Sequence, residues 1–315
     1  MAHEHCDHEH EHLTISTVNR AFIIGIGLNI LFVIIEVLAG IWYDSLALLS
    51  DAGHNFSDVI ALVVALLAFK LLDISPNKHY TYGYRKTTIL AALANAVLLL
   101  VAVVMILWES VVRFQEPVAV DGSTTAIVAG VGILINGFTA WLFLKDKDKD
   151  LNIRGAYLHM LADTLVSVGV VVSGLVIWFT QWYWIDTLMS LVIVAVILMS
   201  TWKLFKESVK LSLDGVPSAL NSEQIERTIT IVEGILAVHH LHVWALSTTE
   251  NALTAHLVVA SDCTFEQIAL IKKDIRHRLS HKNIQHVTLE VEREGERCSE
   301  PICIIVQKGI QLHNH

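Results

Sequence analysis

Six long runs of apolar residues constrain this chain more than any other feature of its sequence. They cover about 19–42, 46–72, 88–112, 122–144, 155–180 and 184–204. Each run reaches the roughly 20 residues that a helix needs to cross a bilayer. The chain as a whole is 54% hydrophobic and only 17% charged, which is more apolar than an ordinary soluble protein. The sequence therefore predicts a membrane protein whose six transmembrane helices lie in the lipid bilayer.

The basic residues predict how these helices are oriented. Lys and Arg gather in the connections after the second, fourth and sixth runs, whereas the other connections offer only Arg113. Because basic loops stay in the cytoplasm, both termini are expected there. The first residues lack the basic region and cleavage site of a signal peptide, so we expect them to be retained. The absence of a transit segment favours a bacterial inner membrane.

Charge and cysteine content limit which ligands the chain can bind and which state its thiols adopt. The net charge is −9 and no basic tract is present, which argues against binding to nucleic acid. The four cysteines fall in segments that we expect in the cytoplasm. There they are reduced thiols or metal ligands rather than a disulfide framework.

The last hundred residues predict a separate domain. "NSEQIERTITIVEG" is typical of a capped amphipathic helix that stops at Gly234. Two strand-like runs then form a hairpin, and a second amphipathic helix and a third strand follow. This order predicts a small α+β domain with its helices on one face of the sheet. The expected divisions are a His-rich tail (1–17), a transmembrane domain (18–208), a cytoplasmic metal-binding domain (209–295) and a C-terminal tail (296–315).

Ionisable residues inside two apolar runs are the strongest functional signal. His54 and Asp58 lie four apart in the second run, and His159 and Asp163 repeat that spacing in the fifth. Residues four apart share one face of a helix. Two imidazoles and two carboxylates supply the donors of a tetrahedral zinc site. A single pair is more often a packing feature, but its repetition in a second helix favours an ion pathway.

Other polar residues interrupt the apolar runs and are expected to face neighbouring helices. They are Asn29, Glu36, Asn55, Asn95 and Asn136.

Four segments together resemble the cation diffusion facilitator family, in the branch of bacterial zinc exporters and vertebrate zinc transporters. They are "SLALLSDAGHNFSD", "YGYRKTTILAALAN", "LHMLADTLVSVGV" and "VHHLHVWAL". The resemblance covers about 14–293 and implies a homodimer with a ferredoxin-like, metallochaperone-like cytoplasmic domain. It also implies that zinc is exchanged for protons and places the transport site on His54, Asp58, His159 and Asp163. No enzymatic activity is expected.

The resemblance further implies zinc sites in the cytoplasmic domain. The family positions map best onto His239, His256 and Glu292, with His286 as a close rival. Strand alternation predicts that His240 and His242 lie on the opposite face from His239. Ordinary solvated histidines remain an alternative for each of these residues.

Two further features resemble parts of relatives. The tails carry His5 and Cys6 in "HEHCDHEHEH" and Cys298 and Cys303 in "CSEPIC", which resemble zinc-binding tails. A disordered tail that only raises the local zinc concentration is the alternative. Lys86 and Asp214 occupy the positions of a hinge interlock, although Lys86 is also explained as a positive-inside residue.

The function predicted from these features is a zinc/proton antiporter that exports zinc from the cytoplasm by alternating access. Imidazole binds metal only when neutral, so protons and zinc compete for His54 and His159. Export of cadmium, cobalt, iron or manganese is the alternative, although a manganese site is expected to be richer in carboxylates. A membrane-anchored metal sensor would not need buried ligands, and a membrane metalloprotease would need a His-Glu-x-x-His motif that the chain lacks.

Overall fold

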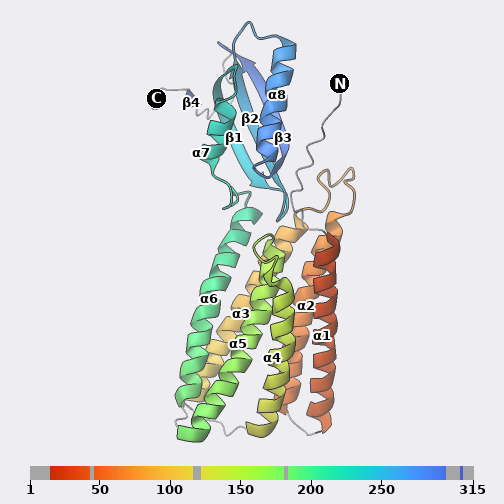
Figure 1. Cartoon of the computed structure of the whole chain (residues 1–315), viewed down its shortest axis with the longest axis vertical. Coiled ribbons are helices and arrows are strands. Elements are labelled where there is room, and N and C mark those ends of the chain that lie inside the picture. Colours follow the sequence, from red (N-terminus) through yellow and green to blue (C-terminus); the bar gives the residue numbers. More distant parts are fainter. Residues whose placement is uncertain (1–14, 43–45, 116–121, 181–183, 296–305, 308–315) are drawn as a thin grey trace. The chain divides into compact units, whose positions relative to one another are not determined.

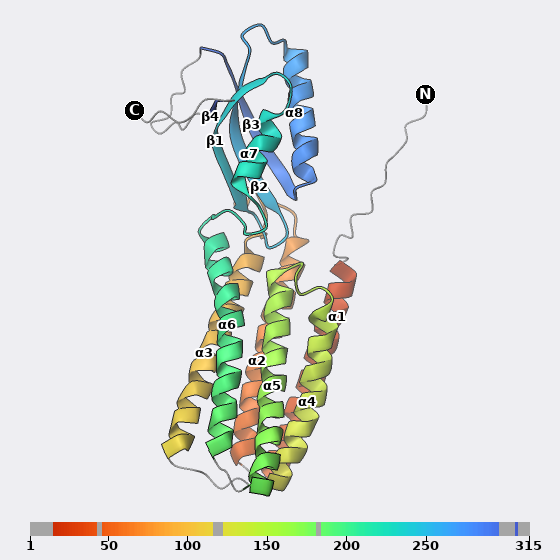
Figure 2. The ribbon, with the colours of Figure 1, turned by 60° about the vertical axis from the view of Figure 1, so that its left-hand side comes forward.

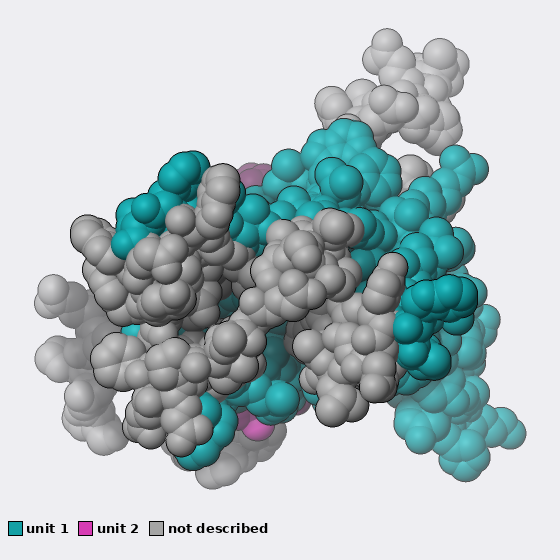
Figure 3. All heavy atoms as spheres, turned by 90° about the horizontal axis from the view of Figure 1, so that it is seen from below, with its two compact units in different colours: residues 1–208 teal, residues 209–315 magenta. Residues whose placement is uncertain are grey.

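The computed structural model describes residues 15–42, 46–115, 122–180, 184–295 and 306–307. These divide between two compact units, residues 1–208 and 209–315, which Figure 3 colours separately, with the remaining residues in grey. Each unit is described by itself.

The first unit is built from six long helices that run side by side (Figures 1 and 2). They are α1 (Ile15–Trp42), α2 (Leu46–Leu72), α3 (Thr87–Gln115), α4 (Gly122–Leu144), α5 (Leu151–Thr180) and α6 (Trp184–Ser212). Each of the six predicted runs lies in one helix, which confirms their number and order. α5 and α6 extend beyond the apolar runs because hydrogen bonding rather than hydrophobicity decides where a helix begins and ends. At the start of α5, for example, Asp150 Oδ1 accepts a hydrogen bond of 2.6 Å from the backbone N–H of Asn152.

Aromatic rings and small residues fit these helices together. The ring of Phe22 on α1 lies with its centroid 4.8 Å from that of Phe143 on α4 and 5.8 Å from that of Phe69 on α2. Gly25 lets α1 approach α4, since a Cβ at this position would lie only 2.8 Å from Cγ2 of Thr139. Close approach through small residues is how helices associate where lipid removes the hydrophobic driving force.

The polar residues within the helices are buried, as predicted. The five named above are each 4% exposed or less. The Nδ2 atom of Asn55 on α2 lies 3.0 and 2.9 Å from the two carboxylate oxygens of Glu36 on α1. Asn29 donates to the backbone carbonyl of Gly25 at 2.8 Å.

The second unit is a four-stranded sheet with two helices packed against it. Its elements are α7 (Ser222–Thr230), β1 (Ile235–Ala245), β2 (Asn251–Val259), α8 (Phe265–Ser280), β3 (Ile284–Arg293) and β4 (Val306–Gln307). The strand order is β3-β2-β1-β4, with β1 antiparallel to β2 and β2 parallel to β3. Figure 2 shows α7 and α8 over the sheet, and both helices contribute to one apolar core with it. The predicted order of elements is confirmed, whereas the short β4 was not predicted.

Local sequence explains the boundaries of these elements. The side chain of Asn221 caps α7 by accepting from the backbone of Gln224, and Thr264 caps α8 in a reciprocal capping box with Gln267. Gly234 ends the turn after α7 at φ +93°, a conformation that glycine adopts without strain.

Candidate metal centre

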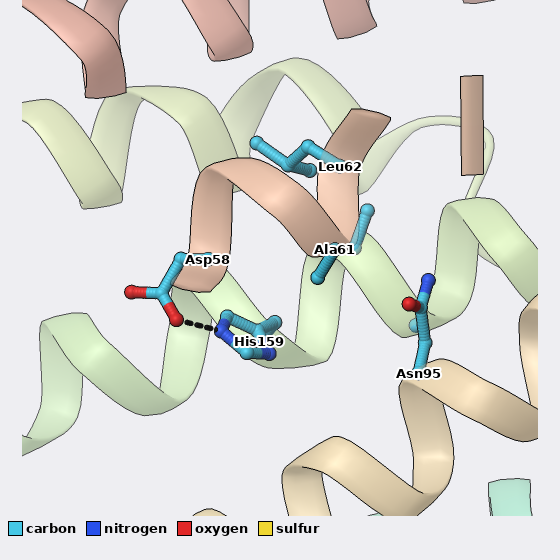
Figure 4. Close-up of a pocket in the computed structure, with 7 residues that line it drawn as sticks. Asp58, Ala61, Leu62, Asn95 and His159 are labelled. Atoms are coloured by element: carbon cyan, nitrogen blue, oxygen red, sulfur yellow. Dashed lines mark hydrogen bonds and ion pairs between the residues drawn. The ribbon is translucent and has the colours of Figure 1, made fainter. Parts of the chain in front are cut away.

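Three of the four ionisable residues predicted in the helices come together inside the six-helix unit. Asp58 on α2 meets His159 and Asp163 on α5, and one ligand atom from each lies within 4.8 Å of the others. The Nε2 atom of His159 contacts Oδ1 of Asp58 directly and lies 4.0 Å from Oδ2 of Asp163. Figure 4 shows Asp58 and His159 pointing toward each other from their two helices. We call these three residues the helical cluster.

Small residues around the helical cluster allow this approach. Asp58 and His159 line a small pocket together with Ala61 and Leu62 of α2 and Gly155 and Ala156 of α5. A Cβ on Gly155 would lie 3.6 Å from both Asn95 and Leu204, which is ordinary van der Waals contact, so this turn of α5 lies close to α3 and α6. The cluster is also well shielded from solvent, since Asp58 is 1% exposed and His159 is 7% exposed.

His54 lies in α2 one turn before Asp58, but its side chain is outside the described residues. The structure therefore brings three of the four residues near one another, and the four-residue metal site stays a prediction. The fourth remains a prediction.

Asn95 is a residue that sequence reasoning assigned only to helix packing. It lines the same pocket from α3, as Figure 4 shows, and it is 3% exposed. Among the described residues, nothing donates a hydrogen bond to its Oδ1 atom. A buried oxygen without a donor is unusual in a folded protein. Asn95 therefore borders the candidate metal site beside Asp58 and His159. The sequence around it gave no sign of this position.

A second cluster forms on three neighbouring strands, and we call it the strand cluster. The Nε2 atom of His239 lies 3.0 Å from Oε2 of Glu292, and Nδ1 of His256 lies 2.7 Å from Oε1. His239 on β1 is paired with His256 on β2, while Glu292 reaches them diagonally from β3. The three residues to which the resemblance pointed therefore lie together, and their binding of zinc stays a prediction.

Electrostatics at the strand cluster favour the ionised carboxylate. Partial burial raises the pKa of Glu292, but hydrogen bonds from His256 and His239 and the charges of both rings outweigh it. The net result is a pKa below the ordinary value of 4.5. Glu292 is therefore available as an anionic ligand at neutral pH.

The predicted placement of His240 on the opposite face from His239 is wrong. The pairing of β1 with β2 shifts register between His239 and His242, and His240 sits in the left-handed region at φ +48°. Its ring centroid lies 4.9 Å from that of His256 and 5.3 Å from that of His239. A bulge breaks the alternation of side chains along a strand, so His240 joins the same group of rings.

His286, the rival ligand, lies away from the strand cluster. It is exposed on β3 beside Ala252, six residues before Glu292, which is about 20 Å along a strand. It is not part of the group whose ligand atoms converge.

The remaining candidates are not brought together by the described structure. Lys86 belongs to the first compact unit and Asp214 to the second, so their interlock remains a prediction. The tail ligands His5, Cys6, Cys298 and Cys303 lie outside the described residues.

Comparison with known protein families identifies the family to which this chain belongs. Residues 22–211 match the model described as the cation efflux transmembrane domain, and residues 217–294 match the one described as the cytoplasmic domain of cation efflux proteins. The chain belongs to the cation efflux family, the cation diffusion facilitators that its motifs resemble. It is an integral membrane protein with a transmembrane domain and a cytoplasmic α+β domain, as predicted.

Individual relatives are similar over nearly the whole chain. A Bacillus subtilis (strain 168) protein named cadmium, cobalt and zinc/H(+)-K(+) antiporter is 37% identical over 90% of this chain and 92% of its own length. The zinc transporter ZitB of Escherichia coli (strain K12) is 34% identical over 100% of this chain and 99% of its own. The metal cation efflux system protein CzcD of Cupriavidus metallidurans is 34% identical over 90% of this chain and 89% of its own length.

Proposed function

We propose that this protein exports zinc from the cytoplasm in exchange for protons, and that His54, Asp58, His159 and Asp163 hold the ion between α2 and α5. The convergence of Asp58, His159 and Asp163 within 4.8 Å carries this proposal. An imidazole and two carboxylates supply the nitrogen and oxygen donors that suit zinc. Ionisable groups inside a membrane domain are costly to bury, so they are rare and usually mark a pathway for ions or protons.

The contact between His159 and Asp58 supports coupling to protons. The ring nitrogen Nε2 of His159 and the carboxylate oxygen Oδ1 of Asp58 are in direct contact, so two atoms that would bind zinc are also placed to share a hydrogen. Imidazole binds metal only when it is neutral, so protons and zinc compete for His159. Zinc binding from the cytoplasm therefore displaces protons from a protonated site, and protonation from the other side releases zinc. An inward proton gradient then drives export.

Orientation, location and assembly follow from the sequence and from the relatives. Basic connections between the helices support cytoplasmic termini, and the bacterial relatives support an inner membrane location. The family resemblance supports a homodimer. In that dimer, zinc at His239, His256 and Glu292 would stabilise the cytoplasmic domain or regulate transport.

A broader ion range is the second candidate. The Bacillus subtilis relative is named for cadmium and cobalt as well as zinc. The same nitrogen and oxygen donors also suit these ions, and affinity order alone separates cobalt from zinc poorly.

Uptake by proteoliposomes tests both candidates. The purified protein is reconstituted with a fluorescent zinc indicator inside, and zinc, cadmium, cobalt or manganese is added outside with or without an acidic interior. We expect zinc uptake that rises with the gradient and disappears when a protonophore collapses it. Zinc uptake that is the same with and without the proton gradient contradicts antiport. Cadmium uptake equal to zinc uptake establishes the broader exporter. If no divalent ion enters, a membrane-anchored sensor replaces the proposal.

A further inference from the structure

Two histidines at the end of α8 belong to neither the helical cluster nor the strand cluster. His277 and His281 are four residues apart and both are exposed. Their Nε2 atoms lie 3.4 Å apart, and the ring centroids are 4.7 Å apart with the planes at 81°. Both nitrogens therefore point toward one region beside the last turn of the helix.

We propose that His277 and His281 form a surface binding site for a divalent cation of the zinc type. Zinc binds imidazole nitrogen at about 2.0–2.1 Å, so two ligands at the tetrahedral angle lie about 3.3–3.4 Å apart. The observed separation of 3.4 Å matches that edge. The same separation lies at the long end of hydrogen-bonding distance, so the two nitrogens are close enough to share one ion.

The surroundings of this pair contain charges that favour a cation and charges that oppose it. α8 ends at Ser280, and the last turn of a helix carries partial negative charge on its carbonyl groups. The guanidinium of Arg278, next to His277, donates its Nε–H to Asp274 at 2.9 Å, which draws its charge toward a carboxylate. Arg276 and Lys282 add positive charge nearby and lower the affinity.

Two protein ligands leave the rest of the coordination sphere to water. Such a site exchanges its ion readily, unlike a closed four-ligand structural zinc site. It shares no residue with the helical cluster, and it does not depend on the function proposed above.

Chemical labelling of the full-length protein in detergent tests the site residue by residue. Diethylpyrocarbonate acylates the lone pair of a neutral imidazole. Zinc on Nε2 leaves the proton on Nδ1, so a metal-bound ring has no lone pair to offer. Zinc at ten times the dissociation constant leaves about a tenth of the sites empty, so labelling of His277 and His281 should slow about tenfold. Peptide mass spectrometry reads each residue separately, and the exposed His79 serves as a control that zinc leaves unchanged.

Single variants separate a shared ion from independent effects. In His277→Gln, zinc should no longer protect His281, and in His281→Gln it should no longer protect His277. Both positions are exposed, so neither change should disturb folding. The proposal is overturned if zinc fails to slow labelling of the wild-type pair at every concentration that the folded protein tolerates. Protection that survives in either variant overturns it as well.

Discussion

The helical cluster and the strand cluster use the same donor types in different ways. On the strands, Glu292 contacts both histidines through its two oxygens, and the three groups satisfy one another at 2.7–3.0 Å. On the helices, His159 contacts Asp58 but is separated from Asp163 by 4.0 Å. The strand cluster is thus closed by its own contacts, while the helical cluster keeps a gap between two ligands.

This difference is consistent with different tasks. A cluster that joins three strands connects the sheet, so an ion bound there would stabilise the fold. A cluster that joins two helices can be opened by relative movement of those helices, which is what alternating access requires. Function therefore depends on the elements that carry the ligands as well as on the ligands themselves.

The largest effect is expected from a pair of matched variants, Asp58→Asn and Glu292→Gln. Each change removes one negative charge and keeps the shape of the side chain. Asp58→Asn should reduce zinc uptake by proteoliposomes to the level of empty liposomes, because we propose that Asp58 holds the transported ion. Glu292→Gln should retain gradient-driven uptake. Comparable losses in the two variants would contradict the division of tasks.

Zinc binding to the strand cluster should be sensitive to Glu292 in a different measurement. Glu292 is the only carboxylate in this group of three ligand candidates, so Glu292→Gln should remove one binding event from a calorimetric zinc titration of the full-length protein. Glu290→Gln is the matched control. Its Oε2 atom lies 3.5 Å from Nε2 of His256, but the side chain is 68% exposed and is not one of the three converging ligand candidates. Equal titrations for wild type and Glu292→Gln would exclude zinc binding at this cluster.

A smaller effect is expected from Asn95→Leu. The Asn95 amide borders the pocket beside His159, and loss of a group that supports metal ligands costs about 10-fold to 100-fold in affinity or activity. We expect about a tenfold slower zinc uptake, with thermal stability unchanged or higher because a buried polar oxygen without a donor disappears.

Asn136→Leu is the control for Asn95→Leu. Asn136 is 2% exposed, and its Oδ1 atom also has no donor among the described residues. It does not line the pocket. If both variants slow transport equally, Asn95 contributes to packing alone.

The smallest expected effect is on the pH dependence of stability. The pKa of Glu292 is lowered in the folded protein, so its stabilising contribution is present above the ordinary value of 4.5 and is lost as the pH falls through the folded value. Without zinc, wild type should melt at a higher temperature than Glu292→Gln at pH 7. The difference should narrow below about pH 4.5. A difference that stays constant across this range would mean that the carboxylate charge does not contribute.

The sequence predicted the features that depend on local pattern. Apolar runs indicated six helices, and the repeated spacing of four residues placed Asp58, His159 and Asp163 on the correct faces. The order of the last elements followed from capping residues and alternation. Each of these depends on residues near one another in the chain.

Features that depend on tertiary structure were missed or mistaken. The bulge at His240 has no marker such as glycine in the sequence, so strict alternation gave the wrong face. The family resemblance favoured His239, His256 and Glu292 over His286, but the strand pattern alone could not, because that choice depends on the strand register. The position of Asn95 at the pocket required the packing of α3 beside α5. The pattern of residues along the chain does not determine distances between residues that are far apart in the sequence.

Zinc uptake by proteoliposomes containing Asp163→Ala tests the central claim most directly. Asp146→Ala is the control, because Asp146 pairs with Lys149 in the connection between α4 and α5. The account predicts that gradient-driven uptake disappears in Asp163→Ala and persists in Asp146→Ala. Uptake at the wild-type rate in Asp163→Ala would show that Asp163 does not hold the transported ion.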